Sequence, residues 1–162
     1  MPTTKVELYL SLGSNIGDRE ANLRAALTAL NRSYGRYQTL SDIIETAPQG
    51  FQSPNAFLNC CVRYELSPRN DEPQQECRRI LKRIKTIEAQ QGRNLEVAFD
   101  TNGRRIYHDR PIDIDILFFG SYRGSDSRVT VPHPRIAERD FVLIPLRQIA
   151  TPDLIRDFPE FF

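Results

Sequence analysis

Two aspartates, Asp113 and Asp115, lie two residues apart in an apolar, β-branched segment that ends in two phenylalanines. Alternation along a strand places both carboxylates on one face, with Ile112, Ile114 and Ile116 on the other. Like charges on one face of a core strand are costly to desolvate unless something compensates them. Mg²⁺ held by one or two carboxylates, water and phosphate oxygens is the usual pattern of phosphoryl-transfer sites. The alternative is an edge strand whose polar face is solvated.

Basic side chains are concentrated on either side of this segment. Guanidinium groups present forked donors that suit phosphate oxygens, so with the aspartates they favour a polyphosphate with Mg²⁺ over a neutral ligand. The alternative is that these arginines are solvated surface residues. The histidine of this set lies between two prolines, where it could donate to phosphate or cap a turn. The set consists of Arg93, Arg110, Arg128, His133, Arg135 and Arg139.

The segment from Pro48 to Asn59 indicates a second pocket. Phe51 and Phe57 offer flat apolar faces, and the Asn59 amide offers two donors and two acceptor positions. Such a set could enclose a flat heteroaromatic ring and read its edge. The alternative for Phe57 is an ordinary core aromatic.

Several other chemistries are excluded or weakened. No GxxxxGK[ST] motif is present, so the chain is not a P-loop enzyme. The glycines of the segment 13–17 favour turn geometry over phosphate binding. Paired carboxylates also occur in glycosidases, but there they flank the scissile bond, whereas Asp113 and Asp115 point the same way from one strand.

Composition predicts a soluble cytoplasmic protein with one domain, residues 1–162. The chain is 40% hydrophobic and 27% charged, and its net charge of +1 gives no bulk attraction to nucleic acid or membrane. Three cysteines with no CxxC spacing fit a reducing compartment, where we expect them to be small core residues. The N-terminus lacks a signal-peptide pattern, and no apolar window approaches the roughly eighteen residues of a membrane span.

Hydrophobic periodicity predicts the element order β-α-β-β-α-β. This order indicates an α+β, ferredoxin-like split βαβ fold: one antiparallel sheet with helices on one face, plus an added hairpin and a C-terminal helix. Residues 93–110 show no clear period apart from a turn or hairpin signal at Asn102-Gly103, so we expect a functional loop there. The predicted strands are 6–12, 37–46, 57–66, 113–119 and 128–131. The predicted helices follow Asp18, run from near Asp71 to Gly92, and span 141–149.

Six motifs, in order, resemble the 6-hydroxymethyl-7,8-dihydropterin pyrophosphokinase family of folate biosynthesis. The resemblance covers about residues 6 to 150, and its last two motifs together are highly specific. The motifs are Gly13-Ser14-Asn15, Thr46-x-Pro48-x-Gly50, Phe57-Leu58-Asn59, Glu88-x-x-Gln91-Gly92-Arg93, Arg110-Pro-Ile-Asp113-Ile-Asp115 and Val131-Pro132-His133-Pro134-Arg135.

The resemblance implies that ATP gives its terminal pyrophosphoryl group to the hydroxymethyl oxygen of the pterin, releasing AMP. Asp113 and Asp115 would then hold two Mg²⁺ ions, and Arg93 and Arg110 would steady the transferred group. The implied ATP-binding residues are Glu88, Ile116, Arg128, Thr130, His133 and Arg139. The implied pterin-binding residues are Thr46, Pro48, Phe57, Asn59 and Phe141.

The chain also departs from the family pattern. The usual tryptophan before the second arginine is replaced, at Tyr107, and Arg104 and Arg105 stand in for other expected basic residues. A competing hypothesis is a non-catalytic ferredoxin-like module that binds a ligand or RNA. Such a module predicts exposed sheet aromatics and a basic excess, and the sequence has neither. We therefore expect small-molecule substrates, no nucleic-acid or membrane partner, and a monomer.

Overall fold

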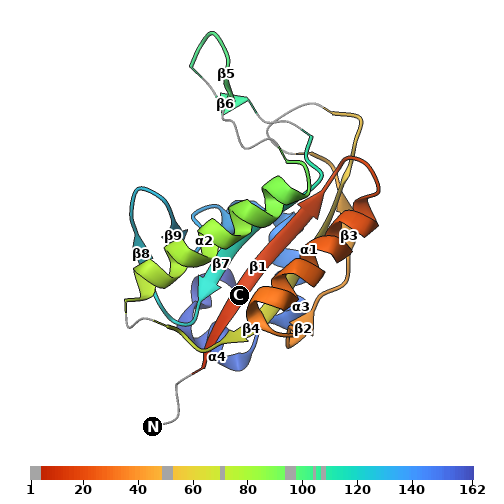
Figure 1. The fold of residues 1–162 in the computed structure, drawn as a ribbon. Helices are drawn as coiled ribbons and strands as arrows, with labels where there is room; N and C mark the ends of the chain where they lie inside the picture. Colours follow the sequence, from red (N-terminus) through yellow and green to blue (C-terminus); the bar gives the residue numbers. More distant parts are fainter. Residues whose placement is uncertain (1–4, 49–52, 70–71, 94–97, 104, 107–108) are drawn as a thin grey trace.

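The computed structural model describes residues 5–48, 53–69, 72–93, 98–103, 105–106 and 109–162. Its centre is an antiparallel sheet in the order β2-β4-β1-β7, with β3 also paired to β4 (Figure 1). β1 is therefore the strand that joins the two halves of the sheet, and β7 is an edge strand. The strands are β1 Val6–Ser14, β2 Thr39–Leu40, β3 Ile44–Thr46, β4 Phe57–Leu66 and β7 Asp113–Phe119.

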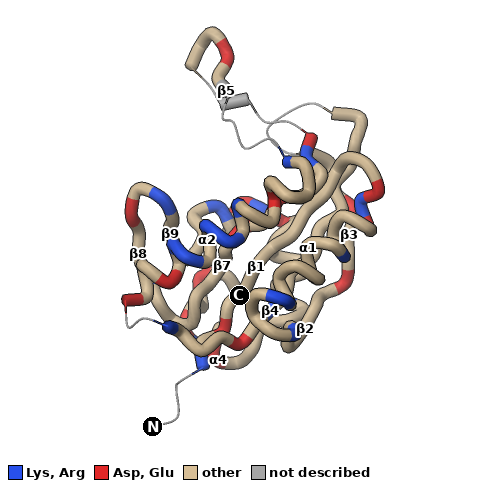
Figure 2. The backbone as a smooth tube through the Cα atoms, viewed as in Figure 1, with Lys and Arg blue, Asp and Glu red and all other residues tan. Residues whose placement is uncertain are grey.

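Two helices, α1 (Arg19–Tyr34) and α2 (Pro73–Gln90), cover one face of this sheet (Figure 1). The Asp18 side chain caps α1 by accepting a hydrogen bond from the Ala21 N–H at 3.1 Å. Both helices bury their apolar stripes against the sheet, whereas the outer side of α2 carries a row of Lys and Arg (Figure 2). The buried stripe of α2 includes Cys77, Ile80, Ile84 and Ile87.

The C-terminal segment covers the opposite face. Helices α3 (Asp140–Ile149) and α4 (Pro152–Asp157) pack there with two short 3₁₀ turns, Ile136–Glu138 and Pro159–Phe161. They form a second apolar cluster with sheet residues. The sheet members of this cluster are Tyr9, Cys61, Leu117 and Phe118.

Two small hairpins complete the fold. β5 (Ala98–Phe99) pairs with β6 (Arg105–Ile106), and β8 (Gly124–Ser125) pairs with β9 (Thr130–Val131). The ferredoxin-like α+β class, its added hairpin and its C-terminal helix are thus confirmed. Among the described residues, no helix has both the length and the apolar character needed to cross a bilayer.

Three predicted strands have wrong bounds. β1 continues past Leu12 because Gly13 and Ser14 still pair with β4. The predicted strand 37–46 is two short strands, because the buried Ser41 hydroxyl accepts the Cys61 N–H at 2.8 Å and interrupts the ladder.

The strand predicted over 128–131 is only Thr130–Val131. The N–H groups of Arg128 and Val129 donate to the Asp126 side chain in a turn instead of to a strand. Helix α4 was not predicted, although Thr151 caps it.

Candidate active site

The strand register brings the predicted metal and pterin residues into one row. Gly13 of β1 pairs with Asn59 of β4 on one side and with Asp113 of β7 on the other. Two residues back, Ser11 pairs with Asp115. Directly paired residues point to the same face of a sheet, so both aspartates and Asn59 share one face. The isoleucines at positions 112, 114 and 116 lie in the core on the other face, as the alternation predicts.

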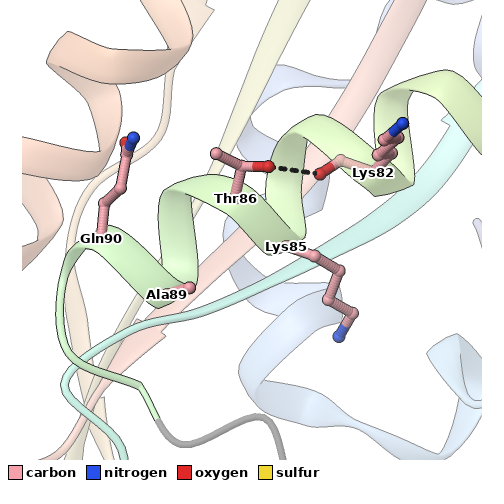
Figure 3. Close-up of a pocket in the computed structure, with 5 residues that line it drawn as sticks. All are labelled: Lys82, Lys85, Thr86, Ala89 and Gln90. Carbon is pink, nitrogen blue, oxygen red and sulfur yellow. Dashed lines mark hydrogen bonds between the residues drawn. The ribbon is translucent and has the colours of Figure 1, made fainter.

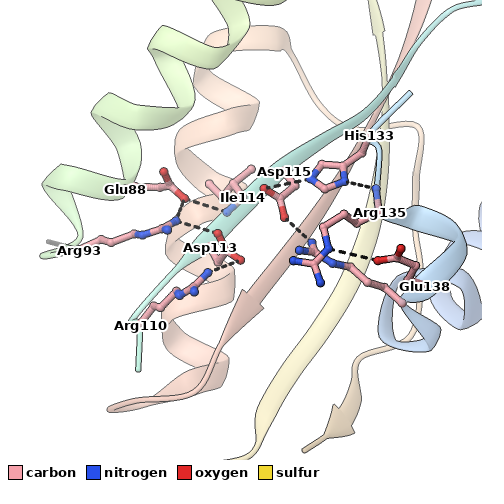
Figure 4. A network of polar contacts seen from close by, with 10 residues as sticks. Glu88, Arg93, Arg110, Asp113, Ile114, Asp115, His133, Arg135 and Glu138 are labelled. Atoms are coloured by element: carbon pink, nitrogen blue, oxygen red, sulfur yellow. Dashed lines mark hydrogen bonds and ion pairs between the residues drawn. The ribbon is translucent and has the colours of Figure 1, made fainter. Parts of the chain in front are cut away.

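Asp113 is held by two arginines (Figure 4). Arg93 Nη1 donates to Asp113 Oδ1 at 2.7 Å, and Arg110 Nη1 donates to Oδ2 at 3.0 Å. Burial acts to raise the pKa of Asp113, but the charges of Arg110 and Arg93 outweigh it and the pKa is lowered. Asp113 is therefore an ionised carboxylate with both oxygens already bonded.

Asp115 has weaker compensation. Arg139 Nη1 lies 3.4 Å from Asp115 Oδ2, and His133 Nε2 lies 4.0 Å from Oδ1. Burial, followed by the negative charge of Asp113, raises the pKa of Asp115 to about 7. A partly exposed carboxylate that its neighbours leave under-compensated is a suitable ligand for a dication.

The donor set fits Mg²⁺ in particular. Carboxylate oxygens are the hard ligands that Mg²⁺ prefers, and one or two of them suffice when phosphate oxygens complete the shell. Within the described ranges, no group of three or more His, Cys, Asp or Glu residues could enclose a metal ion alone. Asp113 and Asp115 therefore fit a metal that arrives with a polyphosphate.

His133 faces Asp115 as a neutral donor. Its Nδ1 accepts the Arg135 N–H at 3.1 Å, which places the proton of the neutral ring on Nε2, toward Asp115. Burial, reinforced by the charge of Arg139, lowers the pKa of His133 to about 4. At neutral pH the ring can therefore donate a hydrogen bond without adding positive charge.

Glu88 ties α2 to the edge strand. Its Oε2 accepts the Ile114 N–H at 2.9 Å and also bonds Arg93, while Lys85 Nζ lies 3.4 Å from Oε1. The side chain is fully buried, and burial raises its pKa although Arg93 and Lys85 oppose the shift. The predicted ATP contact of Glu88 stays a prediction, while its structural contacts hold Arg93 beside Asp113.

A cavity of about 370 Å³ opens beside Asp115. It gathers four residues predicted for the nucleotide side: Ile116, Arg128, Thr130 and His133. It is also lined by Leu81 and Lys85, which the sequence reasoning assigned to the stripe and the basic face of α2. One feature of the sequence indicated that Lys85 lies near the site: it is one helical turn before Glu88.

The predicted pterin residues lie across the sheet from this cavity. Asn59 Nδ2 donates to Thr46 Oγ1 at 2.7 Å, and Thr46 pairs with Phe57 in the β3–β4 ladder. A Cβ at Gly13 would lie 2.8 Å from Asn59 Oδ1, so only glycine allows the Asn59 amide this position.

The other predicted aromatic, Phe141, lies 5.5 Å from the Arg139 guanidinium, measured to the ring centroid. Pro48 is half-buried. Gly50, Phe51, Arg104 and Tyr107 fall outside the described residues.

A second hollow, of about 490 Å³, runs along the outer side of α2 (Figure 3). Lys82, Thr86 and Gln90 line it, and Lys85 extends away from Gln90 and also lines the cavity beside Asp115. Its described lining includes no carboxylate, so the aspartate pair and its cavity remain the candidate site.

The ferredoxin-like sheet carries paired aspartates beside a cavity that is lined by an arginine, a lysine and a histidine. Such a site is suited to an enzyme that transfers phosphate groups. The family model for 7,8-dihydro-6-hydroxymethylpterin-pyrophosphokinase matches residues 9–151. The chain belongs to this family.

Known relatives agree with the family match. The chain is 45% identical over 146 residues to a 2-amino-4-hydroxy-6-hydroxymethyldihydropteridine pyrophosphokinase of Porphyromonas gingivalis, covering 88% of this chain and 90% of the relative. It is 37% identical over 142 residues to the Bacillus subtilis protein of that name, covering 87% and 76%. A crystal structure of Plasmodium falciparum HPPK-DHPS aligns with a TM-score of 0.54 at 13% identity, over 91% of this chain and 39% of that one, and supports the fold alone.

Proposed function

We propose that the protein transfers the terminal pyrophosphoryl group of ATP to the hydroxymethyl oxygen of 6-hydroxymethyl-7,8-dihydropterin and releases AMP, in folate biosynthesis. One observation carries the proposal. Gly13 lies between Asn59 and Asp113 in the sheet, so an amide that can read a pterin edge and a carboxylate that can hold a metal flank one strand. Neighbouring strands are about 4.8 Å apart, so Asn59 and Asp113, which lie on either side of β1, are roughly 10 Å apart across the sheet, near enough for one pair of substrates to reach both.

The aspartate pair is the proposed metal site. Asp113 and Asp115 would hold two Mg²⁺ ions, which would neutralise the carboxylates and supply positive charge to the triphosphate. The raised pKa of Asp115 supports this role because an under-compensated carboxylate gains most from a nearby dication.

The arginines of the site stabilise charge on the transferred group. Arg93 and Arg110 now bond Asp113, and a bound triphosphate would offer them phosphate oxygens in its place. Pyrophosphoryl transfer needs positioning and electrostatic stabilisation more than covalent help from the protein. His133 would donate to phosphate oxygens from the cavity, and Arg139 would do so from beside Asp115. Arg128, Thr130 and the Ile116 backbone would hold the nucleoside end in the cavity.

The pterin would bind at the other end of the row. Thr46 and Asn59 would read its polar edge, and Phe57 and Phe141 would stack on its faces with Pro48 nearby. The Thr46–Asn59 hydrogen bond supports this assignment because it fixes which amide atoms remain for a ligand.

The test is a product assay with ATP, Mg²⁺ and the hydroxymethyl pterin. We expect AMP only when the pterin is present, and no turnover when EDTA removes the metal. ADP as the product would mean ordinary kinase chemistry. Tight ATP binding that does not depend on Mg²⁺, with no turnover, would favour the non-catalytic binding module.

The expected monomeric state, cytoplasmic location and lack of nucleic-acid or membrane partners are part of this proposal. Light scattering coupled to size-exclusion chromatography tests the first: we expect a mass near 18.7 kDa. A mass of twice that value would contradict it.

A further inference from the structure

The carboxylate of Asp109 joins two amide side chains from separate connections of the fold. Asn15 Nδ2 donates to Asp109 Oδ1 at 2.7 Å, and Asn55 Nδ2 donates to Oδ2 at 2.8 Å. Asn15 follows β1, Asn55 precedes β4, and Asp109 precedes β7. A single carboxylate therefore fastens three connections at one end of the sheet.

Asn15 extends this clamp to Arg110. Its backbone N–H donates to the Arg110 carbonyl at 3.1 Å, and its Oδ1 accepts the Arg110 N–H at 2.6 Å. Its Nδ2 also lies 3.3 Å from the Asn55 carbonyl. Asn15 is almost fully buried, with 1% of its surface exposed. The backbone of Arg110 is thus held at both its donor and its acceptor.

We propose that Asp109 is a positioning residue for Arg110. Asp109 orients the Asn15 amide, which in turn fixes the backbone of Arg110. The bond from Asp109 to Asn55 links Arg110 to the connection before β4, the strand that carries the proposed pterin contact Asn59. This inference rests on the proposed function, in which Arg110 steadies the transferred group. Charge-assisted hydrogen bonds suit the task because they are short and directional.

The hydrogen bonds of Asp109 to the Asn15 and Asn55 amides offer a direct test. In Asp109→Asn the side chain keeps its shape but has one acceptor oxygen, so one of the two amides must face another N–H group. We expect kcat to fall about tenfold or more, because a displacement near 1 Å can cost a hundredfold. The KM for ATP should stay within about twofold, because a transition-state contact affects kcat rather than ground-state binding.

A second variant reverses the polarity of the contact. In Asp109→Asn/Asn55→Asp, the new amide at position 109 donates to the new carboxylate at position 55, and its oxygen remains available to Asn15. Net charge is unchanged, and we expect most of kcat to return. The control is Asp153→Asn, which removes an exposed carboxylate paired with Arg156 on α4 and should behave as the wild type.

Melting temperatures separate positioning from general stability. A kcat for Asp109→Asn within twofold of an active wild type would overturn the inference and leave the proposed function standing. So would a double variant that regains the melting temperature but not kcat. A wild type that makes no AMP would overturn the proposed function and this inference with it.

Discussion

Asp113 and Asp115 differ in electrostatic state although they are two residues apart. Both oxygens of Asp113 accept from arginines, whereas Asp115 has Arg139 at 3.4 Å and a neutral histidine at 4.0 Å. The protein compensates the charge of the first carboxylate well and that of the second only weakly. Of the two aspartates, the ionised form of Asp115 would therefore gain more from a nearby cation.

Asp115→Asn should abolish turnover while stabilising the metal-free fold. An acid whose pKa is raised on folding binds its proton more tightly in the folded state, so wild-type stability declines between about pH 4 and about pH 7. The variant cannot ionise at this position, so its free energy of unfolding does not decline in this way. At pH 8 it should be more stable than the wild type by on the order of 1 kcal/mol after solvent screening. Urea unfolding in EDTA at pH 4.5 and pH 8 measures the difference.

The same variant should lose about 10³-fold or more in kcat, because metal-based charge stabilisation supplies several kcal/mol. A variant less stable than the wild type at pH 8, or one that turns over normally, would contradict this assignment of Asp115.

Gly13→Ala should weaken pterin use selectively. The added Cβ would lie 2.8 Å from Asn59 Oδ1 and displace the amide that we propose reads the pterin. We expect the KM for pterin to rise about tenfold, equivalent to about 1.4 kcal/mol, with a smaller change for ATP. In an Asn59→Ala background the same substitution should add little, because the clashing atom is gone. Additive losses in the double variant would show that Gly13 acts elsewhere.

Residue spacing predicted the position of the aspartate pair, and the period-two alternation of Asp113 and Asp115 is confirmed. The family resemblance suggested Ile116, Arg128, Thr130 and His133 as ATP contacts. These four residues line one cavity beside Asp115, and their contact with ATP stays a prediction. Sequence reasoning missed Lys85 as a cavity residue and Asp109 as a partner of Asn15. The Asp109–Asn15 contact spans 94 residues, and local patterns do not encode it. The place of Lys85 depends on how α2 is rotated against the sheet, for which its position one helical turn before Glu88 was the available indication.

The edge position of β7 in the sheet explains why a buried glutamate lies beside this strand. An edge strand has backbone donors without strand partners, and Glu88 accepts one of them from Ile114. The end of α2 is thereby fixed against the strand that carries both aspartates.

Glu88→Ala should therefore destabilise the fold by about 2–4 kcal/mol, because it leaves a buried N–H and an arginine short of a partner. Chemical unfolding measures the loss, and kcat should fall as Arg93 loses one of its two carboxylates. The control is Glu20→Ala on α1, whose exposed ion pair with Arg24 should matter little. Equal stability of the two variants would show that Glu88 does not connect α2 to β7.

Element prediction succeeded where packing and propensity agree. β4 and β7 begin and end at the predicted residues, because each is a continuous run that is apolar on at least one face. The strand predicted over 37–46 failed at Ser41, whose hydroxyl bonds Cys61 and Asp42. Helix α4 could have been predicted, since Thr151 followed by Pro152 is a helix-start signal.

The sheet separates two apolar layers that together form the core of the molecule, and each layer contains at least one of the cysteines. Cys60 and Cys77 lie in the layer under α1 and α2, and Cys61 lies in the layer under α3. All three are buried free thiols, as expected for small core residues. Burial raises the pKa of Cys60 and of Cys77 to about 12 and raises that of Cys61 as well.

None of the three thiols should react with Ellman's reagent at pH 8 in the folded protein, because burial blocks access and suppresses the thiolate. All three should react after denaturation. A cysteine introduced at the exposed position of Thr28 should react at once and serves as the positive control. Rapid reaction of a native thiol would mean that one of the two layers opens readily.

In the proposed reaction two phosphoryl groups leave ATP together. ATP labelled at the β-phosphorus, followed through the reaction with the hydroxymethyl pterin and Mg²⁺, tests this step. The label should appear in the pterin product, and unlabelled AMP should accumulate in equal amount. Label that remains in ADP would show that only one phosphoryl group is transferred.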